Sequence, residues 1–227
     1  MSAVLSADYR EACLWQEQVP REQRPLVDLP DRVDVLVVGA GYCGLGAADA
    51  AAGAGADVLV LDKEPLGWGA SSRNGGMVIP ELKAGPEKLA KKIGDLAHRL
   101  YAEVDEAFDF TEELVAGMQA DYLRSGQLYL AHTPKHTPYL RALTGELQRA
   151  GQAVHFLDAS EVTARTGSTA FDSAIFYEKV GGLHPAKFHD GMARRALAAG
   201  AAIHDRTGVT GIRSDAGGFL VDTTRGT

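Results

Sequence analysis

Two kinds of apolar pattern alternate in the first quarter of the chain. Short, almost unbroken apolar runs fill residues 34–38 and 57–61, and such runs are typical of parallel strands that are covered on both faces. Between them the alanine-rich stretch 42–54 predicts a helix that packs closely against its neighbours, ending at Gly53 and Gly55. This order predicts a strand, a helix and a second parallel strand.

The apolar spacing changes to steps of three and four residues after this unit. Over residues 86–120 that spacing predicts one or two amphipathic helices, whose acidic outer face we interpret as solvated rather than as a metal or acid–base cluster. Strands and helices then alternate. We expect strands at 126–131, 154–157, 174–178, 201–204, 208–212 and 218–223, and helices over 138–150, from about 158 or 160, and over 185–199.

Glycines with separate roles follow the first apolar run. Gly39 allows a tight turn, Gly41 lets the backbone approach a pyrophosphate, and Gly44 lets the helix pack closely on the strand. The N–H groups of the helix N-terminus then face the phosphates. Asp62 ends the second strand at a spacing close to the ~20 residues expected for a ribose-binding acid, and an acid there disfavours NADP. These features together predict a dinucleotide site.

A loop rich in glycine and serine follows at residues 65–76. Its backbone N–H groups and small hydroxyls can wrap a ligand, and it contains Arg73 and Asn74. The apolar residues 77–79 that follow favour a buried loop over a flexible one. Such a loop is unusual after the second strand of a simple NAD unit, so it argues against an NAD-dependent enzyme.

Composition limits the other functions. The 227 residues include 45% hydrophobic and 23% charged positions, as in ordinary globular domains, and the net charge of −7 argues against nucleic acid as a partner. No apolar run approaches the ~20 residues that span a membrane. Two cysteines indicate a reducing, cytoplasmic location. His132 and His136 flank Pro134, which disfavours a helix that would bring them onto one metal, so we expect no metal site.

The two glycine-rich motifs together resemble a known family. Gly39-Ala-Gly-Tyr-Cys-Gly44 and Gly67-Trp-Gly-Ala-Ser-Ser-Arg-Asn-Gly-Gly76 resemble the D-amino-acid-oxidase-type FAD-dependent oxidoreductases, most of all the γ-glutamylputrescine oxidase branch. The resemblance implies an α/β fold, in which a Rossmann-like FAD-binding domain with a parallel sheet carries an inserted α+β substrate domain. We therefore expect a lead-in over 1–31, an FAD-binding domain from 32–85 and 180–227, and a substrate domain from 86–179.

The same resemblance implies which residues bind FAD. The loop of residues 67–76 would run along FAD from the pyrophosphate towards the flavin ring, and the backbone of Val209 would meet the adenine. Cys43 stands where the family often has Thr or Ser, and we interpret it as a small residue beside the pyrophosphate. The expected FAD contacts are Gly39, Gly41, Tyr42, Cys43, Gly44, Asp62, Lys63, Ser71, Ser72, Arg73, Asn74, Gly75, Gly76 and Val209.

Other residues have less specific expectations. Tyr129 and Tyr177 are candidates to face a substrate, although ordinary sheet packing is the expectation for each one alone. His184 is expected in a hinge between the domains rather than as a catalytic base. No side chain is assigned as the base.

The implied activity is oxidation of the carbon–nitrogen bond of a small amine or amino acid. Hydride would pass to flavin N5, the imine would hydrolyse, and oxygen would reoxidise the flavin with release of hydrogen peroxide. The alternatives are a dehydrogenase with another electron acceptor and a non-catalytic, nucleotide-binding remnant. Members of the family continue beyond residue 227, so we expect an N-terminal portion that lacks a C-terminal part and by itself binds FAD weakly or not at all.

Overall fold

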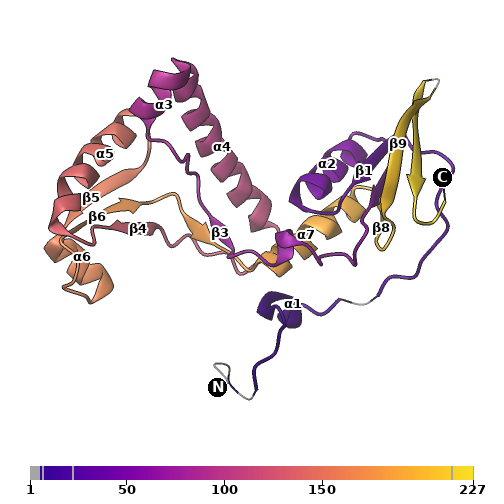
Figure 1. Ribbon diagram of the computed structural model, residues 1–227, viewed down its shortest axis with the longest axis horizontal. Coiled ribbons are helices and arrows are strands. Elements are labelled where there is room, and N and C mark those ends of the chain that lie inside the picture. The colour runs from indigo at the N-terminus through magenta and orange to yellow at the C-terminus, as the bar shows by residue number, and fades with distance from the viewer. Residues whose placement is uncertain (1–5, 7, 22, 216, 227) are drawn as a thin grey trace, which may run out of the picture. The chain divides into compact units, whose positions relative to one another are not determined.

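The computed structural model describes residues 6, 8–21, 23–215 and 217–226. The chain forms two compact units (Figure 1). Unit 1 contains residues 1–75, 118–120 and 184–227, and unit 2 contains residues 76–117 and 121–183. The parts of the predicted lead-in at 1–5, 7 and 22, and the terminal residue 227, lie outside the described residues.

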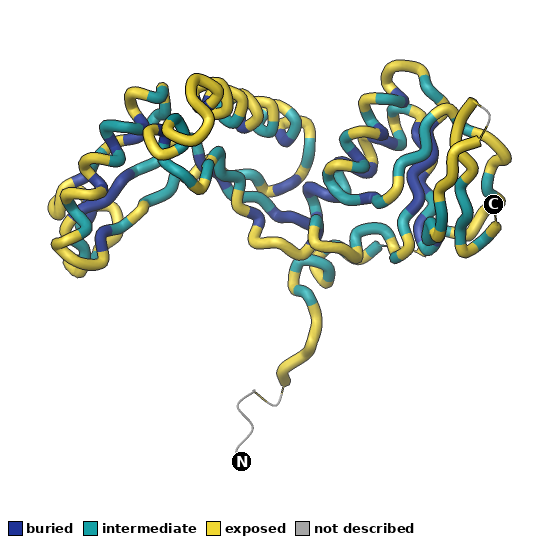
Figure 2. The backbone as a smooth tube through the Cα atoms, turned by 45° about the horizontal axis from the view of Figure 1, so that its top comes forward, coloured by how far each residue is buried: buried dark blue, intermediate teal, exposed yellow. Residues whose placement is uncertain are grey.

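Unit 1 is built on a three-stranded parallel sheet in the order β1-β2-β8. Its strands are β1 (Val35–Val38), β2 (Val58–Leu61) and β8 (Ala202–His204). Every residue of β2 is buried, because this strand has a neighbour on each side (Figure 2). The parallel register of β1 and β2 confirms the predicted strand–helix–strand unit.

Two helices of unit 1 pack against each other and against this sheet. They are α2 (Tyr42–Gly53) and α7 (Pro185–Ala198). A Cβ built on Gly46 of α2 would lie 3.8 Å from the methyl carbon of Met192 in α7, so the two helices are in close contact. The small residues of α2 therefore have the packing role that the alanine-rich pattern predicts.

The lead-in over residues 1–31 is not extended throughout. It contains a short helix, α1 (Leu14–Gln18), whose Trp15 ring lies edge-on against the His184 ring at 4.8 Å. Side chains of the lead-in also bind backbone carbonyls of unit 1, as when the Arg21 guanidinium donates to Ala186 O at 3.1 Å. Polar and aromatic contacts with distant residues thus shape the lead-in, and local spacing does not reveal them.

Unit 1 ends in the antiparallel strands β9 (Val209–Asp215) and β10 (Gly218–Thr223). The flavin-type loop predicted between 65 and 76 contains one turn of 3-10 helix, η1 (Ala70–Ser72).

Unit 2 has a three-stranded antiparallel sheet in the order β4-β6-β5. Figure 1 shows α5 running alongside this sheet, and α3 leading into the long helix α4. The elements are β3 (Met77–Val78), α3 (Pro86–Ile93), α4 (Leu96–Ala116), β4 (Gln127–Leu130), η2 (Pro134–His136), α5 (Thr137–Arg149), β5 (Val154–Asp158), α6 (Ala159–Thr166), β6 (Ser173–Tyr177) and β7 (Gly181–Gly182).

The core of unit 2 lies between its sheet and its helices. One cluster combines Tyr101 of α4 with Leu140 and Leu147 of α5 and Ile175 of β6. A second cluster lies where Val162 of α6 packs against the sheet. Since neighbouring residues of a strand point to opposite faces, alternate residues of β6 enter the two clusters.

The acidic face of α4 is only partly solvated, which corrects the interpretation from sequence. The Lys179 ammonium lies 2.6 Å from Asp105 and 2.9 Å from Asp109. The Arg124 guanidinium lies 2.9 Å from Glu112. Both cations lie outside the predicted helix, Arg124 shortly after it and Lys179 far along the chain, so the spacing of the acids alone could not indicate them.

Helix α6 begins at the first of the two predicted starting positions, 158 and 160, with Asp158 as its N-cap. Asp158 accepts from the backbone N–H groups of Ser160 and Glu161, and the Glu161 carboxylate accepts from the Asp158 N–H at 2.9 Å. These charge-assisted bonds hold the pKa of Asp158 below its ordinary value.

Within the described residues, no helix combines the length and the apolar character that crossing a membrane requires. The same residues contain no group of three or more His, Cys, Asp or Glu side chains placed to hold a metal ion. The His132 and His136 rings do lie together, edge to face at 4.6 Å.

Candidate functional site

The turn after β1 needs glycine at two positions for different reasons. Gly39 has φ +95°, in the region that side chains disfavour, and its N–H donates to Leu61 O at 2.7 Å. A Cβ on Gly44 would lie 1.9 Å from Gly39 O and 3.2 Å from Val37 Cγ1. Gly44 thus allows the close approach of α2 to β1 that the sequence predicts.

The N-terminus of α2 is bound to the loop from another part of unit 1. Helix α2 follows Gly41, which has no side chain to cap it, and the Ser71 hydroxyl accepts from the Tyr42 N–H at 3.2 Å. Within the described part of the chain, the N–H groups of Cys43 and Gly44 have no hydrogen-bond acceptor. The first turn of α2 therefore retains donors for an anion.

Asp62 lies at the end of β2 and holds the glycine turn. Its Oδ2 accepts from the Ala40 N–H at 2.8 Å, and its Oδ1 accepts from the Glu64 N–H at 3.0 Å. Each carboxylate oxygen has two lone pairs, so one further hydrogen bond remains possible at each. The acid is therefore fixed by the backbone while it keeps acceptor capacity.

The loop from Gly67 to Gly76 folds on itself through Ser72. The Ser72 side chain is 1% exposed, and its hydroxyl donates to Gly67 O. Its N–H donates to Gly69 O at 3.2 Å. The structure thus gives Ser72 an internal role, and its contact with FAD stays a prediction.

The next two side chains of the loop lie on its exposed surface. The Arg73 guanidinium stacks over the Trp68 ring at 4.3 Å from the ring centre. The Asn74 amide donates to Ala70 O, Ser71 O and the Tyr42 hydroxyl, each at 3.2 Å. Asn74 therefore ties the loop to helix α2.

Tyr42 connects this loop with helix α7. Its hydroxyl lies 3.5 Å from Pro185 O, and its ring meets the Phe188 ring edge-on at 5.1 Å. Burial raises the pKa of the Tyr42 hydroxyl, and the hydrogen bond from Asn74 opposes the rise. The phenol is therefore a neutral hydrogen-bonding group near pH 7.

His189 on α7 is a member of this site that sequence reasoning missed. Its ring is 1% exposed, and Nε2 lies 2.7 Å from Ala40 O, so Nε2 carries the donated proton. Burial lowers the pKa of His189, and Nδ1 has no partner among the described residues. A histidine amid the apolar positions of a helix is a weak signal, because such residues are common in cores.

His184 has a structural role within unit 1. It is the N-cap of α7, where Nδ1 accepts from the Lys187 N–H at 3.3 Å, and its Nε2 lies 3.1 Å from Gln18 Oε1. Both ring nitrogens are therefore engaged, and His184 is the residue at which the chain re-enters unit 1 after unit 2.

Lys63 lies next to Gly208, the residue that precedes Val209. The Thr207 N–H donates to Asp62 O at 2.7 Å, and a Cβ on Gly208 would lie 3.3 Å from Lys63 Cβ. Strand β9 begins at Val209, immediately after these contacts. The end of β2 and the start of β9 thus form one edge of unit 1.

This site fits a dinucleotide. The first turn of α2 offers N–H donors at a point where Gly41 presents no side chain, and a fixed carboxylate lies at the end of the next strand. A Cβ on Gly41 would reach 3.2 Å from the Ser71 hydroxyl, so a side chain there would press on the loop. The arrangement can hold a diphosphate against a helix N-terminus and a ribose against an acid.

Comparison with known proteins agrees with this arrangement. The model of the family described as "DAO: FAD dependent oxidoreductase" matches residues 34–227. The chain is 30% identical to a probable oxidoreductase OrdL of Rhizobium meliloti, over 94% of this chain and 51% of that protein. It is 31% identical to the gamma-glutamylputrescine oxidoreductase of Escherichia coli, over 79% of this chain and 43% of that protein.

A solved structure supports the same fold. Glycine oxidase from Geobacillus kaustophilus superposes with a TM-score of 0.70 and 25% identity, over 86% of this chain and 52% of that chain. The chain thus spans about half the length of the curated relatives it matches. The predicted α/β fold class, family resemblance and FAD cofactor are confirmed.

Proposed function

This chain belongs to the DAO family of FAD-dependent oxidoreductases, and from this premise we propose that the protein oxidises the carbon–nitrogen bond of a small amine or amino acid. Hydride from the carbon beside the nitrogen would pass to flavin N5, and oxygen would take the electrons to give hydrogen peroxide. Two relatives, a gamma-glutamylputrescine oxidoreductase and a glycine oxidase, support this substrate class by their names.

The observation that carries the proposal is the turn that joins β1 to α2. The N–H groups of Cys43 and Gly44 would hold the FAD pyrophosphate, because they face outward from the helix N-terminus without an acceptor among the described residues. Gly39 and Gly41 keep this position free of side chains. The exposed Cys43 side chain would lie beside the phosphates as a small residue.

The adenosine part of FAD would lie along the edge formed by β2 and β9. Asp62 would accept from the ribose hydroxyls with its remaining lone pairs while the Ala40 and Glu64 N–H groups hold it in place. Lys63 and the backbone of Val209 would contact the adenosine from the same edge.

The loop of residues 67–76 would follow the cofactor from its pyrophosphate towards its flavin ring. Ser71 and Asn74 are fixed against Tyr42, so they would present backbone and side-chain groups at defined positions. Ser72, Arg73, Gly75 and Gly76 complete the predicted contacts. When bound, FAD supplies the two-electron acceptor that the amino-acid side chains lack.

We also propose a cytoplasmic location, because a reducing compartment would keep the two cysteines in their free thiol form.

A flavin spectrum tests the proposal directly. The protein as its gene encodes it is purified, its absorbance between 350 and 500 nm is recorded, and it is mixed without air with single amines and amino acids. We expect one of these compounds to bleach the flavin, and peroxide to appear when air is admitted. Bleaching without peroxide would indicate that the electron acceptor is not oxygen. A flavin that no amine or amino acid reduces would refute the proposal.

A further inference from the structure

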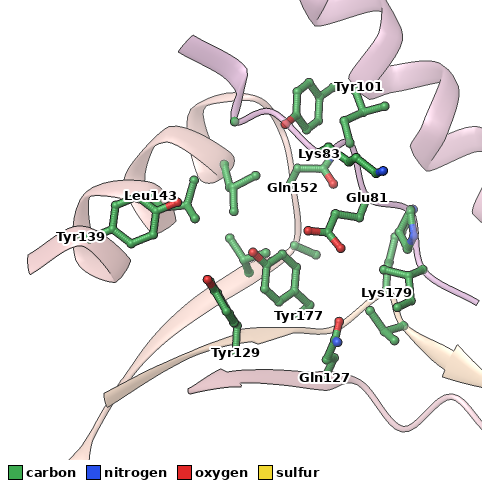
Figure 3. Close-up of a pocket in the computed structure, with 18 residues that line it drawn as sticks. Glu81, Lys83, Tyr101, Gln127, Tyr129, Tyr139, Leu143, Gln152, Tyr177 and Lys179 are labelled. Carbon is green, nitrogen blue, oxygen red and sulfur yellow. The ribbon is translucent and has the colours of Figure 1, made fainter. Parts of the chain in front are cut away.

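Unit 2 contains a cavity of about 390 Å³ that is separate from the dinucleotide-binding residues of unit 1. Figure 3 shows tyrosine side chains gathered in it from different elements. Tyr129 comes from β4, Tyr177 from β6, Tyr139 from α5 and Tyr101 from α4, while residues 79–83 and 85 form another wall. A cavity of this size can hold a small organic molecule.

The tyrosines differ in whether their hydroxyl groups form hydrogen bonds within the protein. The Tyr101 hydroxyl donates to Ala84 O at 2.7 Å, and its ring belongs to the core. The hydroxyls of Tyr129, Tyr139 and Tyr177 make no hydrogen bond with any described residue. Tyr129 is 46% and Tyr139 58% exposed, although both are large aromatic residues. These three rings therefore leave apolar faces and hydroxyls available in the cavity.

Glu81 supplies a negative charge beside these rings. Its carboxylate has no cationic partner within 4.0 Å among the described residues. Burial, followed by the charge of Glu81 and the neighbouring tyrosines, raises the pKa of Tyr177 to about 12. Figure 3 shows the Glu81 carboxylate next to the Tyr177 ring.

The two lysines of the wall do not cancel this charge at the rings. The Lys179 ammonium is bound by Asp105 and Asp109, so that group of three carries a net negative charge. Figure 3 shows the Lys83 ammonium directed away from the three tyrosine rings. The part of the cavity next to Tyr129, Tyr139 and Tyr177 is therefore aromatic and negative.

We propose that this cavity binds an organic ammonium group, with Tyr129, Tyr139 and Tyr177 around the cation and Glu81 as its counter-ion. Aromatic faces attract cations, and a carboxylate partner strengthens the attraction in a partly desolvated site. A carboxylate or phosphate ligand would be repelled by Glu81, and a neutral alcohol would leave that charge unpaired. This proposal rests on the proposed amine oxidation only in its choice of amines as ligands. Binding in the cavity itself needs no flavin.

Calorimetric titration with butylammonium at pH 7 tests this site, with butan-1-ol and butyrate as ligands of similar size. We expect butylammonium to bind, and the alcohol and the anion to bind at least about ten-fold more weakly. Glu81→Gln should weaken butylammonium binding about ten-fold or more. Tyr139→Leu should weaken it about three-fold or more, while Tyr139→Phe, which keeps the aromatic face, should retain most of the affinity.

The matched control is Glu103→Gln on the exposed side of α4, which removes the same charge from unit 2 outside the cavity. It should leave the affinity unchanged, and circular dichroism should show that all variants are folded. Equal binding of butanol, unchanged affinity in Glu81→Gln, or no butylammonium binding would overturn the cavity proposal. Flavin bleaching by an amine in such a case would leave the proposed oxidation intact, while binding without any bleaching would refute only the oxidation.

Discussion

His189 and Ala40 are joined by a hydrogen bond of 2.7 Å between the histidine Nε2 and the alanine carbonyl, across 149 positions of the chain. The N–H of Ala40 donates to Asp62 Oδ2 at 2.8 Å. Both polar backbone groups of this buried alanine are therefore bound by side chains from other elements. The glycine turn is held in one conformation before any ligand arrives, which lowers the entropic cost of binding.

The His189 contact predicts how stability depends on pH. The lowered pKa of His189 means that the folded state resists protonation, while the unfolded chain binds a proton below about pH 6.5. Stability should thus be fully present above pH 6.5 and fall as the pH drops towards the lowered folded pKa, by at most about 1.4 kcal/mol per pH unit. Urea unfolding at pH 7.5, 6.5 and 5.5 measures this.

Tryptophan fluorescence is a suitable signal because both tryptophans, Trp15 and Trp68, lie in unit 1. His189→Gln keeps a donor near Ala40 O without a titrating ring. The free energy of unfolding should therefore change less between pH 6.5 and 5.5 in this variant. His98→Gln, at an exposed position of α4, is the control and should keep the slope of the original protein. An unchanged slope in His189→Gln would contradict the assignment.

Gly44→Ala should destabilise unit 1. Its Cβ would lie 1.9 Å from Gly39 O, and the backbone oxygen must move to avoid the overlap. We expect a loss of about 1–3 kcal/mol in the free energy of unfolding, measured by urea titration. Gly53→Ala in the same helix meets nothing within 4 Å and should instead add about 0.5–1 kcal/mol. Equal effects of the two substitutions would exclude close packing as the reason for Gly44.

Ser71→Ala should loosen the loop from α2, because Tyr42 N–H loses its acceptor. Losing such a contact at a helix N-terminus costs about 0.5–2 kcal/mol, and FAD affinity should decrease as well. Ser71→Thr keeps the hydroxyl and should restore both properties. Fluorescence titration of the apoprotein with FAD measures the affinity, and an alanine variant that binds as tightly as the original would exclude this role.

Asp62→Asn should weaken FAD binding and also destabilise the glycine turn. One carboxylate oxygen becomes an NH₂ group, which would face the N–H of either Ala40 or Glu64. An unsatisfied polar group of this kind costs about 1–3 kcal/mol, and the charge that would hold the ribose is also lost. We expect the FAD dissociation constant to rise about ten-fold or more in titration. The control is Asp57→Asn. Asp57 is exposed at the other end of β2, so this variant should bind FAD normally.

The strand–helix–strand unit could be predicted because its determinants are local. Apolar runs, the glycines at 39 and 44 and the terminal acid each restrict the backbone within a few residues. A helix start at 158 or 160 was predictable for the same reason, since an N-cap bonds to residues two and three positions ahead, and the structure selects Asp158. The helix α1 was not, because its contacts with Gly67 and His184 come from distant parts of the chain.

The amino-acid sequence by itself determined the βαβ unit and its dinucleotide-type turn, because steric and hydrogen-bonding rules act there over short spans, and the resemblance of its glycine-rich loop to a family indicated FAD. Only the tertiary structure decided that His189 binds Ala40, that Ser71 caps α2, and that tyrosines from several elements share a cavity with Glu81. Such contacts depend on which side chains folding brings together, and no periodicity along the chain encodes that.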